Sequence, residues 1–223
     1  MKKIPLIILG IAGGLLLGFG LPFGCKKVNP TGKHVMVIGD SQSKFAGGWQ
    51  DQIATMYNFG KLTNLSEGGK YTSWLLKNRF IPYFANSANP IPEILFIWGG
   101  SGNDGDSMIP KDTTYSNVQQ MVDIARAKGV KYVYVFSGFN RDKTIVPANP
   151  YYNRLSAPYK NPKNRTNYRE MSLGMPLAIK NADCVIPQFQ NVNANSTMDG
   201  IHLKIKPDMT NLASWIGQQI FLR

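Results

Sequence analysis

Short apolar runs alternate with amphipathic segments along the chain from residue 33 onward. The apolar runs predict strands at 34–38, 61–65, 94–98, 131–136 and 184–187. The spacing of apolar residues between them predicts helices at 48–57, 72–83, 115–128, 168–181 and 207–221. This alternation predicts a flavodoxin-like three-layer α/β/α sandwich around a five-stranded parallel sheet.

The first apolar stretch of the chain is longer than any of these strands. Residues 4–23 carry no charge, and a helix needs about twenty apolar residues to span a bilayer. We therefore expect a membrane anchor or lipoprotein-type signal at 1–27, a tether at 28–33 and one domain at 34–223. An uncleaved anchor is favoured over lipid on Cys25, because the residues before Cys25 fit a lipoprotein signal poorly.

Three glycines share one face of the predicted membrane helix, namely Gly10, Gly14 and Gly18. Small residues at this spacing let membrane helices pack closely, although glycine is common in membrane helices in any case. Lysines flank both ends of the stretch, so the positive-inside rule does not orient it.

The chain is basic, with a net charge of +12. Much of the excess lies in 139–169, where basic side chains alternate with tyrosines, and the candidate substrate-binding residues there are Arg154, Tyr159, Lys160, Lys163 and Arg165. Such a segment can bind an anionic polymer. The alternative interpretation is an ordinary solvated loop with no binding role. Nucleic acid is not favoured as a partner, because no P-loop, zinc-finger or RNA-binding signature accompanies the segment.

The sequence favours neither a disulfide nor a metal site. Cys25 is expected at the membrane edge and Cys184 in a buried strand, so the two are not expected to pair. Asp104 and Asp106 are two closely spaced carboxylates without further candidate ligands, and the chain has no Cys/His cluster. We predict no metal and no cofactor.

Polar, glycine-containing segments follow the first three predicted strands, at 39–41, 64–69 and 99–104, and another precedes the last helix at 199–202. Because the carboxyl ends of parallel strands meet at one edge of a sheet, we expect these segments to converge. Acyl transfer by a serine needs a nucleophile, a base, a group that orients the base, and donors for the developing oxyanion.

These four segments, in this order, resemble those of the SGNH hydrolases, the GDSL esterase and lipase superfamily. The resemblance covers 34–223 and implies that Ser41 is the nucleophile, His202 the base and Asp199 the orienting acid. It also implies an oxyanion hole formed by the Ser41 backbone with Gly69 and Asn103. The sequence departs from the family pattern at two points near the predicted oxyanion hole. Ser101 replaces a usual glycine near Asn103, and Gly68 is an alternative donor to Gly69.

The resemblance implies ester chemistry on acyl groups. Together with the anchor and the basic segment, it predicts a membrane-anchored serine esterase or deacetylase. Its expected substrates are acyl esters, first of all acetyl esters, on a cell-envelope polysaccharide or peptidoglycan, or a lipid-type ester. The alternatives are a non-catalytic or virion-associated protein that holds an anionic envelope polymer, and an acyltransferase. In each case the domain is expected outside the cytoplasm or at a viral membrane.

Overall fold

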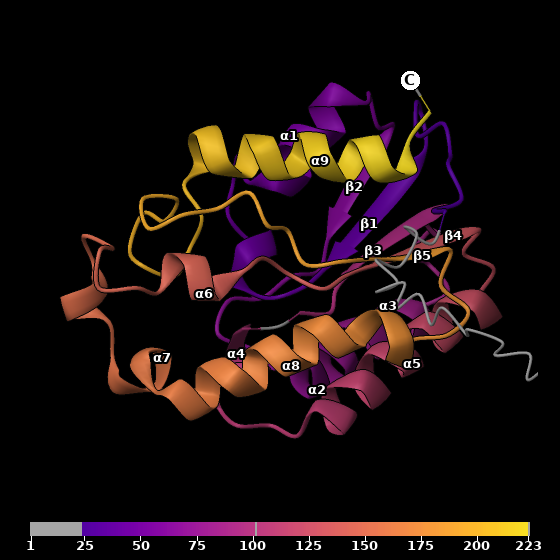
Figure 1. Ribbon diagram of the computed structural model, residues 1–223. Helices are drawn as coiled ribbons and strands as arrows, with labels where there is room; N and C mark the ends of the chain where they lie inside the picture. Colours follow the sequence, from indigo (N-terminus) through magenta and orange to yellow (C-terminus); the bar gives the residue numbers. More distant parts are fainter. Residues whose placement is uncertain (1–23, 101, 223) are drawn as a thin grey trace, which may run out of the picture.

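A five-stranded sheet lies between two layers of helices in the computed structural model, which describes residues 24–100 and 102–222 (Figure 1). All neighbouring strands are parallel, in the order β2-β1-β3-β4-β5. The strands are β1 (His34–Ile38), β2 (Lys61–Asn64), β3 (Ile94–Trp98), β4 (Tyr132–Phe136) and β5 (Cys184–Ile186). The predicted flavodoxin-like sandwich is confirmed, and each predicted strand lies within one residue of its observed bounds.

The two faces of the sheet carry separate hydrophobic layers. Side chains alternate across a strand, so in β1 Val35 and Val37 point to one layer and Met36 and Ile38 to the other. One face is covered by α1 (Trp49–Met56) and α9 (Thr210–Ile220) (Figure 1). The other is covered by α2 (Thr72–Leu75), α3 (Ile81–Ala85), α5 (Lys111–Ala127) and α8 (Pro162–Ala178).

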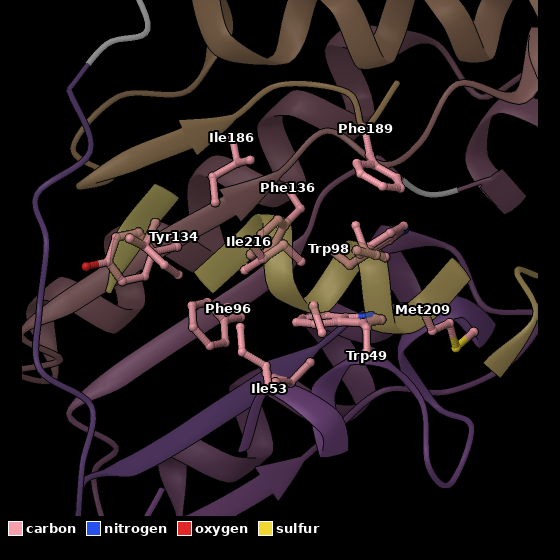
Figure 2. Packing of buried hydrophobic residues seen from close by; sticks show 14 of the residues in the cluster. Trp49, Ile53, Phe96, Trp98, Tyr134, Phe136, Ile186, Phe189, Met209 and Ile216 are labelled. Carbon is pink, nitrogen blue, oxygen red and sulfur yellow. The ribbon is translucent and has the colours of Figure 1, made fainter. Parts of the chain in front are cut away.

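An aromatic cluster fills the layer under α1 and α9. Figure 2 shows Trp49 of α1 against the sheet, with ring centroids 6.2 Å from Phe96, 5.8 Å from Trp98 and 5.4 Å from Phe136. The indole N–H of Trp49 donates to the Ser43 hydroxyl over 3.3 Å. The core therefore holds the turn that follows β1 as well as the strands themselves.

The second predicted helix, 72–83, is divided in the structure. A π-helical turn (Leu76–Phe80) separates α2 from α3, and the Ile81 N–H donates to the Leu76 carbonyl five residues back. Pro82 follows directly, and a proline has no N–H and collides with the carbonyl four residues before it. The wider turn accommodates that proline within a continuous helical path.

The basic segment 139–169, predicted as a loop, is largely helical. It contains α6 (Arg141–Thr144), a 3₁₀ turn (Tyr152–Arg154) and α7 (Ala157–Lys160), and α8 begins at Pro162 rather than at residue 168. The Asn161 side chain accepts from the Lys163 N–H and so caps α8. Pro162 then occupies the first helical position, where its missing N–H costs nothing. The early turns of α8 are polar, so apolar spacing did not reveal them.

The other helix bounds also differ from the prediction at polar or irregular turns. α5 begins four residues earlier than predicted, where the Thr113 and Thr114 N–H groups donate to the Pro110 carbonyl. A short helix, α4 (Gly102–Asp106), follows β3 and was not predicted. The last predicted helix, 207–221, is a turn (Ile205–Met209) followed by α9.

The segment predicted as a tether, 28–33, is part of the folded domain. The Val28 N–H donates to the Ile220 carbonyl, and the Leu222 N–H donates to the Val28 carbonyl. Thr31 forms an isolated bridge with Phe59. The folded domain therefore begins before residue 34.

The prediction that Cys25 and Cys184 do not pair is wrong. They form a disulfide across 159 residues, with their Cα atoms 4.9 Å apart. The Tyr134 hydroxyl donates to the Lys26 carbonyl and helps to hold the N-terminal segment at this edge of the sheet. Cys184 is buried, as expected, but the path of residues 24–28 brings Cys25 to it.

No helix in residues 24–100 and 102–222 is long and apolar enough to cross a membrane. The predicted anchor at 4–23, with Gly10, Gly14 and Gly18, lies outside the described residues. Membrane attachment therefore stays a prediction from the sequence.

We expect reduction of the Cys25–Cys184 disulfide to lower the free energy of unfolding by about 2–5 kcal/mol, because it releases a long closed loop in the unfolded chain. Urea unfolding of the full-length protein with and without reductant measures this change. Reductant should not affect the variant Cys25→Ser/Cys184→Ser. Two free thiols per chain after purification without reductant would contradict the disulfide.

Candidate active site

The candidate site lies at the carboxyl ends of β1 and β3, where the strand order reverses. β1 pairs with β2 on one side and with β3 on the other, and this is the crevice in which open α/β sheets bind ligands. β1 leads through Gly39 into the 3₁₀ turn η1 (Ser41–Ser43). A Cβ atom on Gly39 would lie 2.5 Å from the Trp98 Cβ, so a glycine lets the two strand ends approach closely.

The side chains of Ser41, His202 and Asp199 form a continuous hydrogen-bonded chain. His202 Nε2 lies 2.9 Å from the Ser41 Oγ, and His202 Nδ1 lies 2.5 Å from the Asp199 Oδ2. With the ring proton on Nδ1, His202 donates to Asp199 and accepts from the Ser41 hydroxyl. This is the arrangement that a serine nucleophile, its base and the acid that orients the base require.

Asp199 is held ionised by hydrogen bonds. Partial burial raises the pKa of its carboxyl, but the His202 side chain and the N–H groups of His202 and Ile201 outweigh burial and lower the pKa to about 2. Those backbone N–H groups lie 2.8 and 2.9 Å from the Asp199 Oδ1. An ionised Asp199 stabilises the imidazolium that forms when His202 takes a proton.

Gln42 connects the nucleophile turn to the loop that carries the histidine. Its amide nitrogen donates to the Ile201 carbonyl over 3.0 Å, and its amide oxygen lies 3.4 Å from the Leu203 N–H. These two backbone groups flank His202. The ring of Phe45 packs edge-on to the imidazole, with centroids 5.0 Å apart. Gln42 and Phe45 thus restrict His202 from two sides.

Asp40 connects the ends of β1 and β3. Its side chain is 3% exposed and accepts from the Gln42 N–H over 2.9 Å and the Gly102 N–H over 3.1 Å. Burial raises the pKa of the Asp40 carboxyl to about 6. Asp40 is therefore a turn and helix-start residue, and among the described residues it makes no contact of the kind that Asp199 makes with His202.

The candidate oxyanion donors differ in their position relative to Ser41. Asn103, at the start of α4, lines the same hollow as Ser41, and its amide donates one hydrogen bond to the Lys70 carbonyl over 3.1 Å. A Cβ atom on Gly68 would lie 3.6 Å from the Ser41 Cβ, whereas one on Gly69 would meet no atom within 4 Å. Gly69 has a φ of +70°, which favours glycine. Both glycines stay candidate donors.

Two hollows adjoin at the site. The smaller has a cavity volume of about 30 Å³ and is lined by residues that include Ser41, His202, Trp98, Phe139 and Arg141. The larger, about 320 Å³, is lined by Gly69, Tyr71, Asn103, Asp106, Ser107, Ser156, Pro158 and Tyr159. Asn103, Asp106 and Tyr159 line both hollows, so these three residues form the boundary between them.

The five candidate substrate-binding residues have different surroundings in the structure. Tyr159 lines both hollows, whereas Lys163 lines a different hollow beside α8. Arg165 pairs with Asp142 over 3.0 Å. The Lys160 Nζ lies over the Tyr152 ring, 5.8 Å from its centroid, and Arg154 ends the 3₁₀ turn that contains Tyr152.

The carboxylates considered for a metal are engaged by protein groups. Asp104 is buried and accepts from the Thr72 and Thr114 hydroxyls. Asp106 forms an ion pair with Arg141.

Gln42 and Arg141 are residues of the candidate site that the sequence did not reveal. Gln42 follows the candidate nucleophile directly, and Arg141 follows the fourth strand closely. Polar side chains that follow parallel strands lie at the edge of the sheet where ligands bind, and this position was the available signal for both residues.

Comparison with known proteins supports the fold. No protein-family model and no curated protein matches the sequence. Among solved structures the chain is similar to TesA, at 19% identity and a TM-score of 0.54 over 83% of this chain and 96% of that one. The chain has the fold of the GDSL esterases. The fold that the resemblance to the SGNH superfamily implies is confirmed.

Two further structures show the same likeness. A member of the lipolytic protein G-D-S-L family from Veillonella parvula matches at 14% identity and a TM-score of 0.55, over 83% of this chain and 96% of that one. A carbohydrate esterase family 3 protein from Talaromyces cellulolyticus matches at 15% identity and a TM-score of 0.55, over 82% and 94%.

We expect Gln42→Leu to slow the labelling of Ser41 by a serine-directed fluorophosphonate by roughly ten- to a hundredfold, because a displaced His202 activates the hydroxyl poorly. Mass spectrometry of the labelled protein over time measures the rate. Gln52→Leu is the matched control, since the Gln52 amide also donates to a backbone carbonyl, that of Ile205, which does not flank His202. Equal labelling of Gln42→Leu and the wild type would contradict a role in positioning the histidine.

We expect Asp40 to make folding less favourable as the pH rises. Its pKa is raised on folding, so its contribution to stability is present below pH 4 and is lost as the pH rises through about 6. Between pH 4 and 7 the wild-type free energy of unfolding should fall by roughly 2 kcal/mol relative to Asp40→Asn.

Urea unfolding at a series of pH values measures the two slopes. Slopes are compared because the variant also loses a hydrogen-bond acceptor and starts from lower stability. Asp199 acts in the opposite sense: its lowered pKa adds stability above pH 4 that is lost as the pH falls through about 2. Parallel curves for the wild type and Asp40→Asn between pH 4 and 7 would show that Asp40 is not the titrating group.

Proposed function

We propose that this protein is a serine esterase that removes short acyl groups, of acetyl size, from a saccharide of the cell envelope. The observation that carries the proposal is the position of His202 between the Ser41 hydroxyl and the Asp199 carboxylate. The fold shared with GDSL and carbohydrate esterases agrees with it.

The proposed reaction has two steps. The Ser41 oxygen attacks the acyl carbonyl while His202 takes the hydroxyl proton, and the proton then passes to the departing alcohol as its bond to the acyl carbon breaks. Water next attacks the acyl-enzyme with His202 again taking a proton, which returns to Ser41 as the acid leaves. An acceptor alcohol in place of water would make the same site an acyltransferase.

The two hollows suggest which part of the substrate each one holds. The smaller hollow, about 30 Å³, has room for a group of two or three heavy atoms, since one water-sized group needs about 10–15 Å³ of such space. The larger, about 320 Å³, is in the range of small-ligand sites and suits a sugar ring. Tyr71, Tyr159 and Ser107 along it supply ring faces and hydroxyl groups. The acyl group is therefore assigned to the smaller hollow and the alcohol to the larger one.

The disulfide supports a location outside the cytoplasm, because disulfides persist in oxidising compartments. The same bond engages the Cys25 sulfur, which argues against lipid on that atom. Cys184 begins β5, whereas the site lies at the carboxyl ends of the strands. An anchor at 4–23 would therefore join the domain at the end of the sheet opposite the site, leaving the site free to reach a polymer.

The alternative of a purely binding protein has less support. Arg165 and Arg169 both pair with Asp142, so part of the basic segment is already neutralised within the chain. Arg141 is buried beside Asp106. The surface left for an anionic polymer is smaller than the sequence indicates.

We expect the full-length protein to hydrolyse p-nitrophenyl acetate at least tenfold faster, in kcat/KM, than p-nitrophenyl octanoate, because the smaller hollow excludes a long chain. Ser41→Ala should lose this activity by a thousandfold or more and should not be labelled by a fluorophosphonate. Ser214→Ala, on α9, is the control for a serine outside the site. Retained turnover in Ser41→Ala, or no turnover by the folded wild type, would refute the proposal.

A further inference from the structure

Arg141 is a buried arginine at the floor of the candidate site. It is the first residue of α6, which follows β4, and it is only 5% exposed. Its Nη1 donates to the Asp106 carboxylate over 3.0 Å. Its guanidinium carbon lies 4.8 Å from the ring centroid of Tyr168 and 5.5 Å from that of Tyr159. These contacts hold the planar guanidinium in one orientation.

The second amino group of this guanidinium is left without a partner. Arg141 Nη2 is buried and makes no hydrogen bond to any described residue. The indole N–H of Trp98 is buried and unpartnered in the same way. Both side chains line the smaller hollow together with Ser41 and His202. A buried donor without an acceptor is destabilising, so an oxygen in this hollow would remove a penalty that the folded protein otherwise bears.

The surrounding charges favour a neutral oxygen over an anion. Asp106 already balances the charge of Arg141, and the buried carboxyl of Asp40 lines the same hollow. A carboxylate or phosphate on the substrate would meet these groups in a region of low dielectric, where like charges repel strongly. A hydroxyl oxygen can accept from Arg141 without adding charge.

We propose that Arg141 is a specificity residue, which donates from Nη2 to a hydroxyl oxygen on the second carbon of a short acyl group. The inference rests on the proposed function, because it takes the smaller hollow as the acyl site. It deepens that function: among acyl groups of similar size, the enzyme favours a hydroxyacyl group such as glycolyl over a wholly apolar one such as propionyl.

The test compares ethyl glycolate with ethyl propionate, whose acyl groups differ by a hydroxyl in place of a methyl. Release of acid gives kcat/KM for each ester, and the glycolate-to-propionate ratio is compared between the wild type and Arg141→Lys. Lysine keeps a positive charge for Asp106 but lacks a second nitrogen. We expect the ratio to fall at least tenfold in Arg141→Lys. The intrinsic reactivities of the two esters cancel when this ratio is compared between the wild type and Arg141→Lys.

Arg126→Lys is the matched control. Arg126 also pairs with an aspartate, Asp183, over 2.6 Å, but it makes this pair beside the first residues of β4 and β5, away from the smaller hollow. Its replacement should lower stability and leave the ratio unchanged. An unchanged ratio in Arg141→Lys, or faster hydrolysis of a malonyl half-ester than of the propionyl ester, would overturn the inference.

A binding measurement separates this inference from the proposed function. Glycolamide and propionamide are neutral and unreactive, and NMR titration of the Ser41→Ala protein measures their affinity without turnover. We expect glycolamide to bind at least tenfold more tightly, and Arg141→Lys in that background to remove the difference. Absence of esterase activity with this difference intact would refute only the proposed reaction. Equal binding of the two amides would refute the role of Arg141.

Discussion

The carboxylate of Asp40 joins the two strand ends on which the candidate site is built. It accepts one hydrogen bond from the turn after β1 and one from the start of the helix after β3. The first holds Ser41 and the second holds the residue before Asn103. Because Asp40 is buried, these bonds cost desolvation of a carboxyl whose pKa is raised to about 6. The candidate nucleophile and a candidate oxyanion donor therefore depend on the same buried side chain.

The histidine depends on a different support, because it comes from the far end of the chain. Asp199 orients its ring from within the same loop, and Gln42 holds the backbone on either side of it from the nucleophile turn. Gln42 follows Ser41 in sequence, so the turn that presents the candidate nucleophile also positions the candidate base. A short distance between Ser41 and His202 thus follows from one side chain that contacts both segments.

The disulfide and the site occupy opposite ends of the sheet. Cys184 begins β5, whereas Ser41 follows β1. The covalent bond to Cys25 fixes the N-terminal segment along β4 and α9, away from the hollows. The hollows in turn differ in size, and the buried Arg141 lines the smaller one with a donor that has no partner among the described residues.

The sequence by itself determined the sheet, because strands and their polar ends are local patterns: buried runs such as 94–98 alternate with amphipathic helices, and Ser41, Asp199 and His202 stand out at segment ends. It did not reveal helix turns that polar residues begin, such as the one capped by Asn161. Only the tertiary structure paired Cys25 with Cys184, set Gln42 beside the His202 loop and buried Arg141 next to Asp106. Those contacts join residues up to 161 positions apart, and they depend on the path of the chain rather than on any local pattern.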